Sequence, residues 1–352
     1  MEKYKHPEPY ELEEVFANFS STTFVRNFAK EKGIFMPNAP KAVLAKELSF
    51  FFFDKDDISR IHNEAYQKNY KNTLAGFIVN NTESDFELIN SVEALISDGA
   101  AKDMTIVTPR LISKRNEPEI YKSSITYNRR RLGRMEFLQS ENTEFDFYIK
   151  KKNDEWLIEV DSKRSKDPSI IRDLLGKHLR RKIEIEEIRD MLTTEKTILF
   201  FDALAKQGMN TNIWEFSDVV QLSFKKDKDQ ETDEDPDSEA NEAELAGISK
   251  AILDGKNLRE NKFVKDSENE GYRFTAMTYE FRSKKENSSI QVKAEFKGNP
   301  KVFEVSIPLY GNWAGLKGTF FPSTLSNNED LNFRSEFWNN AKDIYFKLKD
   351  AY

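Results

Sequence analysis

The sequence has no cysteine and only three histidines, His6, His62 and His178. The absence of cysteine excludes disulfide bonds, cysteine-ligated zinc, iron–sulfur clusters and thiol nucleophiles, and it fits a reducing compartment. The three histidines are far apart and show no metal-ligand spacing, so neither a histidine metal site nor a Ser–His–Asp triad is favoured. We therefore expect no cofactor under the leading interpretation given below.

Long apolar segments are also missing. The longest apolar run, Phe50–Phe53 with its neighbours, is far shorter than the ~20 residues that a membrane-spanning helix needs. Residues 1–14 contain no apolar signal region. These two features predict a cytoplasmic protein that is not embedded in a membrane.

The chain lacks net positive charge, since its 352 residues carry a formal charge of −7. Residues 227–244 alone hold ten acidic residues and one lysine and contribute −9, which leaves +2 for the remainder. A segment so charged and so poor in apolar residues cannot bury enough surface to offset chain entropy. We predict an acidic disordered linker at 223–245, and any surface that binds nucleic acid must be local.

Apolar periodicity is what the chain does have, together with 38% hydrophobic residues and 28 phenylalanines. Helical spacing prevails in the N-terminal part and alternation of period two prevails later. We predict an α+β fold with an N-terminal helical cap and two related modules, each an antiparallel sheet with flanking helices. The predicted boundaries are 1–70 for the helical region, 71–222 for the first module and 246–352 for the second. Two further predictions are a buried strand at 197–201 and a helix at 245–253.

The two modules share one segment that aligns without a gap, 141–160 with 286–305. Both segments alternate apolar and polar residues around a turn, at 153–154 in the first and at 298–299 in the second. The aligned apolar positions are Phe145, Phe147 and Ile149 in the first segment and Ile290, Val292 and Ala294 in the second. We infer a partial internal repeat in which each module holds a helix followed by an antiparallel meander.

Residues 20–53 combine two helical stretches with an extended piece that contains Pro37 and Pro40. The stretches FVRNFAKEKGI and KAVLAKELSFFFF give this region its resemblance to the SAP-type helix–extended–helix modules, which are small DNA-binding units. The resemblance implies a contact with DNA. The residues themselves are also compatible with a plain helical cap packed on the main body.

An acidic residue on one strand, a hairpin and an acidic-x-lysine strand follow one another at Asp146, Asp161 and Lys163. This order resembles the PD-(D/E)xK nucleases. The resemblance implies that Asp146 and Asp161 hold Mg²⁺ and that Lys163 positions or deprotonates the attacking water. The chain departs from the pattern because Phe145 replaces the proline before Asp146. If Glu159 is taken as the motif acid, Asp161 occupies the lysine position.

Basic residues gather in several stretches of the first module, where they could contact the phosphates of a nucleic acid. A solvated, salt-bridged surface is the alternative interpretation. The candidate contacts are Arg129, Arg130, Arg131, Arg134, Lys150, Lys151, Lys152, Arg164, Lys177, Arg180, Arg181 and Lys182.

The leading hypothesis is a non-enzymatic component that binds nucleic acid, or a protein partner, through its first module. The reason for this preference is the aligned second segment. At the positions of the acids and the lysine of the first segment it has Gln291, Glu304, Ser306 and Pro308. A hairpin that recurs without the full set of these side chains indicates a structural element rather than an active site. The alternatives are an Mg²⁺-dependent nuclease and a structural subunit of an assembly, for which Phe50–Phe53 would suit a protein interface. A role in bacterial defence would suit the first two hypotheses, although no residue argues for it.

Overall fold

The structure is a computed structural model that describes residues 6–67, 72–81, 88–97, 104–113, 118–130, 136–138, 140–152, 155–179, 183–226, 250–269, 272–298, 301–314 and 319–351. The chain divides into two compact units. The first unit comprises residues 1–70, 102–105 and 125–144, and the second comprises 71–101, 106–124 and 145–352. The predicted acidic linker lies outside the described residues from 227 onward.

The N-terminal part of the first unit is built from short helices, in agreement with the helical spacing of its sequence. They are α1 (Pro9–Glu14), the π-helix η1 (Val15–Phe19), α2 (Thr22–Glu31), α3 (Lys41–Ser49) and α4 (Lys55–Gln67), followed later by the 3-10 turn η2 (Glu136–Leu138). The Ser21 side chain accepts a hydrogen bond from the Phe24 amide and thereby caps α2. Phe16, Phe28 and Phe53 meet in the centre of its core.

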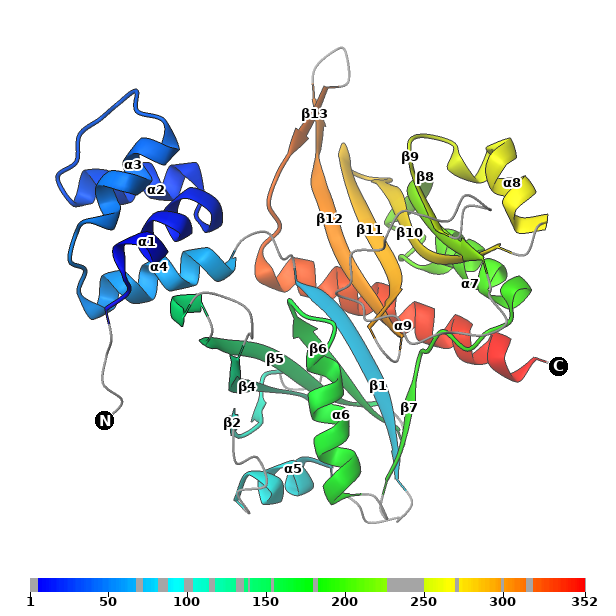
Figure 1. The fold of residues 1–352 in the computed structure, drawn as a ribbon. Coiled ribbons are helices and arrows are strands. Elements are labelled where there is room, and N and C mark those ends of the chain that lie inside the picture. Colours follow the sequence, from blue (N-terminus) through cyan, green and yellow to red (C-terminus); the bar gives the residue numbers. More distant parts are fainter. Residues whose placement is uncertain are drawn as a thin grey trace. The chain divides into compact units, whose positions relative to one another are not determined.

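The strands form one antiparallel sheet, which together with the helices confirms the α+β class (Figure 1). The order across the sheet is β2-β4-β5-β6-β1-β12-β11-β10-β8-β9, and β3, β7 and β13 pair with β4, β1 and β12. The strands are β1 (Thr73–Asn81), β2 (Met104–Ile106), β3 (Arg110–Leu111), β4 (Ile120–Arg130), β5 (Ser140–Lys152), β6 (Glu155–Ser162), β7 (Ile183–Glu187), β8 (Trp214–Lys226), β9 (Lys250–Asp254), β10 (Tyr272–Ser283), β11 (Ser288–Lys297), β12 (Val302–Ala314) and β13 (Thr319–Pro322).

Helices cover both faces of the sheet in the second unit. These helices are α5 (Leu88–Ser97), α6 (Asp167–His178), α7 (Thr194–Gln207), α8 (Lys262–Asn269) and α9 (Asn327–Asp350), with the 3-10 turn η3 (Leu258–Glu260). The core on the α7 and α9 side contains Phe200, Phe303 and Trp338. Helix α6 lies on the other face. Its Arg172 pairs with Glu187, and Glu187 lies opposite Phe77 in the β1–β7 pair. Neighbouring residues of a strand point to opposite faces, so Phe77 and Glu187 point away from the face on which Gly76 meets α9.

Two local predictions are wrong. Residues 197–201, predicted as a strand, belong to helix α7, where Thr197, Phe200, Phe201 and Leu204 are buried at helical spacing. A short apolar run fits a buried strand and a buried helix equally well. Here the Thr193 side chain accepts a hydrogen bond from the Lys196 amide and caps the start of the helix. The predicted helix at 245–253 is also incorrect for its described part, because Lys250–Asp254 forms strand β9.

The aligned segments of the predicted repeat are both antiparallel hairpins, β5–β6 and β11–β12, but they differ in detail. Ile149 pairs with Ile158, whereas Ala294 pairs with Val305, two residues away from the aligned position. Val292 lies in the core beneath α9, whereas Phe147 occupies the opposite face of the sheet. Strands from both predicted modules share one sheet, in which β8 pairs with β10, so the duplication stays a prediction.

Candidate functional site at the β5–β6 hairpin

Asp146 and Asp161 lie directly opposite each other on strands β5 and β6. Directly opposed residues of an antiparallel pair project to the same face, so the two carboxylates share one face of the sheet. Asp146 Oδ2 is 2.7 Å from Lys122 Nζ, and Asp161 Oδ1 is 2.7 Å from Arg334 Nη1. Each carboxylate therefore has a cationic partner from within the fold.

Lys163, the third residue of the nuclease pattern, lies outside strand β6. The strand ends at Ser162, whose hydroxyl donates a hydrogen bond to the Asp167 carboxylate at the start of α6. Lys163 follows in a bend, with its side chain exposed. Residues two apart point to the same face only while both belong to a strand. Because Lys163 lies past the end of β6, its spacing from Asp161 does not determine the direction of its side chain.

Glu159, two residues before Asp161, is 0% exposed. One of its oxygens is 2.7 Å from Lys150 Nζ. The other accepts hydrogen bonds of 2.9 Å from the Ser335 hydroxyl and of 2.9 Å from the Asn339 amide. A buried carboxylate is costly unless it is paired and hydrogen-bonded, and both conditions are met here. Lys150, one of the candidate phosphate contacts, thus holds an internal ion pair.

Helix α9 provides most of the partners of these acids. It starts with a capping box in which Ser326 and Glu329 bond each other's backbone amides. Two turns further on, Arg334 is 1% exposed and binds both Asp161 and Asp330. Burial opposes the charged guanidinium, but the two carboxylates outweigh it and raise the pKa of Arg334.

A glycine lets α9 approach the sheet closely enough for these contacts. A Cβ atom at Gly76 of β1 would lie 2.8 Å from the Ile158 carbonyl oxygen and 3.0 Å from the Trp338 ring. The contact with the backbone oxygen is too short for a real Cβ atom, and the contact with the ring is tight enough that Trp338 would have to move. Because Gly76 has none, Trp338 packs directly on β1, and the polar residues of the same helix reach Glu159 and Asp161.

We call Lys122, Asp146, Lys150, Glu159, Asp161 and Arg334 the hairpin ion cluster. It contains three carboxylates and three cations, and Arg334 is also paired with a fourth carboxylate, that of Asp330. At its exposed edge the hydrogen bond to Asp146 raises the pKa of Lys122, and burial raises the pKa of the Tyr148 phenol. Within the described residues, no group of three or more histidine, aspartate or glutamate side chains is placed to hold a metal ion. A divalent cation at Asp146 and Asp161 would compete with Lys122 and Arg334 for these carboxylates.

The candidate phosphate contacts are spread over several elements. Arg129 is half-buried on β4, Arg164 is half-buried between β6 and α6, and Lys151 and Lys177 are exposed. Arg130 and Lys152 belong to β4 and β5, but their side chains are outside the described part of the structure. The remaining candidates, Arg131, Arg134, Arg180, Arg181 and Lys182, lie outside the described residues.

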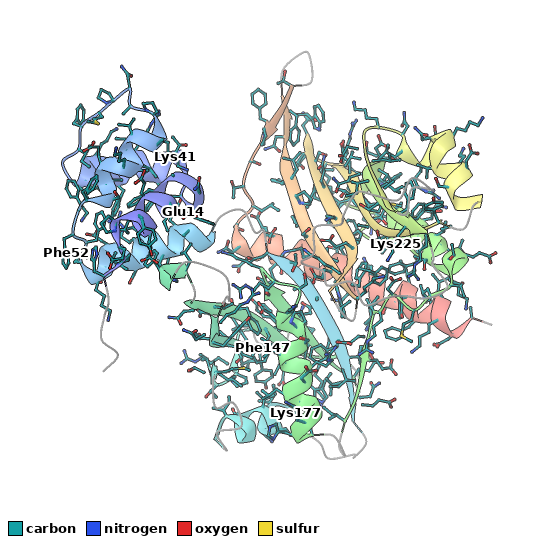
Figure 2. The ribbon with its side chains drawn as sticks, viewed as in Figure 1. Glu14, Lys41, Phe52, Phe147, Lys177 and Lys225 are labelled. Atoms are coloured by element: carbon teal, nitrogen blue, oxygen red, sulfur yellow. The ribbon has the colours of Figure 1, made fainter. Side chains whose placement is uncertain are left out.

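The topology brings two of the basic stretches to one end of the sheet. Strand β5 ends at Lys152, which pairs with Glu155, and β1 ends nearby because Val79 pairs with Trp156. Strand β7 starts at the same end, since Asn81 pairs with Ile183. Helix α6 leads into β7, so Lys177 near its C-terminus and Lys151 near the hairpin tip belong to one end of the sheet (Figure 2 labels Lys177).

The carboxyl of Glu304 on β12 entered the sequence interpretation only as the residue aligned with Glu159, and the structure shows that it is buried. It is 1% exposed, and neither oxygen has a hydrogen-bond partner of good geometry among the described residues. Burial raises its pKa to about 7, with Lys297 opposing this shift and Glu295 adding to it. The one sequence signal was its alignment with Glu159, which is also buried.

The sequence matches no known family model and none of the curated proteins with which it was compared. Across the described residues, every helix is too short or too polar to cross a membrane. Function must therefore be argued from the site itself.

Proposed function

We propose that this protein is a non-enzymatic nucleic-acid-binding protein that contacts phosphates with the basic end of its β5–β6 hairpin and helix α6. The observation that carries the proposal is the placement of Lys151 and Lys177, both exposed, at one end of the sheet. The run Arg180, Arg181 and Lys182 joins α6 to β7 and adds three charges to the same chain segment. Exposed cations on separate elements can follow a phosphate backbone, because such contacts need charge and reach rather than base-specific geometry.

The pairing within the hairpin ion cluster supports a binding role over hydrolysis. Each acid of the cluster is held by a cation at 2.7 Å. Such pairing stabilises a fold, whereas metal-dependent hydrolysis needs carboxylates that are free to coordinate.

Salt-dependent binding tests this proposal. The wild-type protein should shift labelled DNA or RNA, with an affinity that falls steeply as salt rises. The plot of log affinity against log salt has a negative slope. Replacing Lys151 and Lys177 with alanine should make this slope less steep by about 2, because each lysine that no longer neutralises a phosphate removes roughly one unit. The matched control replaces Lys284 and Lys285, two exposed lysines in the β10–β11 turn, and should leave the slope unchanged. Equal reductions of the slope in both variants would reject the proposed surface.

A second candidate function is supported by the direct opposition of Asp146 and Asp161. Two carboxylates on one face of a hairpin suit the Mg²⁺-dependent nuclease that the sequence pattern resembles. In that function a metal would compete with Lys122 and Arg334 for the two carboxylates, and Lys163 would act on the attacking water. Cleavage that requires Mg²⁺ or Mn²⁺, is lost in Lys163→Ala and is kept in Lys166→Ala would establish it, since both lysines are exposed. Binding without cleavage would favour the first function. If the protein neither binds nor cleaves nucleic acid, the hypothesis of a subunit of a protein assembly is favoured instead.

A further inference from the structure

Strand β9 is an edge of the sheet. It pairs with β8 over Lys250–Asp254, and no other described strand pairs with its second edge. Ala251 and Leu253 pack against the core, whereas Ile252 at the strand centre is 57% exposed. An exposed apolar residue in the middle of an open edge is a ready template for another strand.

The pairing with β8 shows which backbone groups of β9 are open. The Gly255 amide donates to the Val220 carbonyl, so residue 255 is turned toward β8. Backbone direction alternates along an antiparallel strand, so residues 251 and 253 are also turned toward β8. The amides and carbonyls of residues 250, 252 and 254 therefore point to the open edge, with Ile252 in the centre.

The sequence of this strand is complementary to itself. A second antiparallel copy centred on Ile252 sets Ile252 against Ile252, and Lys250 of each chain against Asp254 of the other. Residues 250, 252 and 254 are also the ones whose backbone groups are open, so this register pairs all of them. Within one chain the register sets Lys250 opposite Lys225 of β8, so no acidic residue stands opposite Lys250 on that strand (Figure 2 labels Lys225).

We propose that β9 is a homodimerisation edge, through which two copies of this chain join their sheets about a two-fold axis at Ile252. The interface is isologous, so the same five residues serve both subunits. One short strand pair buries little surface, and the dimer is therefore weak and reversible.

Charge exchange at positions 250 and 254 tests the proposal. Light scattering across a concentration series should show the wild-type mass rising toward twice the monomer mass. Lys250→Asp sets aspartate against aspartate and Asp254→Lys sets lysine against lysine, so each variant alone should stay monomeric. A mixture of the two variants should dimerise again, because each then presents the charge that the other lacks. Lys256→Asp, the same charge change at an exposed position just after the strand, should dimerise like the wild type.

A backbone variant gives an independent reading. Ile252→Pro removes an amide that points to the open edge and no hydrogen bond to β8, so the chain should fold but remain monomeric. Circular dichroism checks the fold of each variant. A wild-type protein that is monomeric at every concentration, as when another segment or partner occupies the edge, overturns the proposal. Failure of the mixed variants to associate also overturns it.

Discussion

Asp161 and Arg334 form a 2.7 Å ion pair between the end of strand β6 and helix α9, although 173 residues separate them in the chain. Arg334 is 1% exposed, and its second carboxylate partner is Asp330. The pair ties the β5–β6 hairpin to the helix that covers it. It also occupies a carboxylate that the nuclease hypothesis assigns to a metal.

We expect Arg334→Met to lower the free energy of unfolding by about 3–5 kcal/mol, because it leaves the Asp161 carboxylate in a protein environment without its cation. Asp161→Asn combined with Arg334→Met should cost less than Arg334→Met alone, since the unpaired charge is then removed as well. Urea unfolding measures both values. Arg282→Met, at an exposed arginine, is the control, and a double variant no more stable than the single one would contradict the pairing argument.

Gly76 should not tolerate a methyl group. Gly76→Ala would place a carbon atom 2.8 Å from a backbone oxygen and 3.0 Å from Trp338, and we expect it to lower the free energy of unfolding by about 1–3 kcal/mol. The matched control is Gly176→Ala in helix α6, where a Cβ atom meets nothing within 4 Å. That change should raise stability by about 0.5–1 kcal/mol, because alanine is the better helix former. Equal effects of the two changes in thermal unfolding would refute the close-approach argument.

Glu304 should make stability depend on pH. Its pKa is about 7 in the folded state against an ordinary value of 4.5, so the folded state holds its proton more tightly than the unfolded state does. The resulting stabilisation is complete below pH 4.5 and is lost as pH rises through about 7, a total of about 3 kcal/mol. Comparing wild type with Glu304→Gln by urea unfolding at a series of pH values isolates this contribution. Parallel pH profiles for the two proteins would show that the carboxyl does not titrate in this range.

Phe53 and Phe50 should differ sharply although both belong to the same run of phenylalanines. Phe53 is 0% exposed and packs on Phe16 and Phe28, whereas Phe50 is 68% exposed. Phe53→Ala should lower the free energy of unfolding by about 3–5 kcal/mol, and Phe50→Ala should change it by less than about 0.5 kcal/mol. Thermal unfolding followed by circular dichroism measures both. Similar losses of stability would mean that Phe50 is also buried in solution, as in an assembly.

Local patterns predicted the elements that depend on neighbouring residues. Helical spacing located α1 to α4, and strict alternation located the β5–β6 hairpin, because one buried face is enough to fix each of these elements. The same reasoning failed at Thr197–Phe201, where a short apolar run fits a helix as well as a strand. It also gave no sign that Glu304, a charged residue of a strand, is buried.

The sequence by itself determined the fold class, the absence of cysteine chemistry and the alternating hairpin around residues 153–154, since all of these follow from composition or from short-range periodicity. The register that sets Asp146 opposite Asp161 was read from the structure. Only the tertiary structure decided that Asp161 is bound by Arg334, that Glu159 is held by Lys150, Ser335 and Asn339, and that β9 is an edge among the described strands. These outcomes depend on segments far apart in the chain. Their meeting is set by the packing of the whole sheet and its helices, which no local pattern encodes.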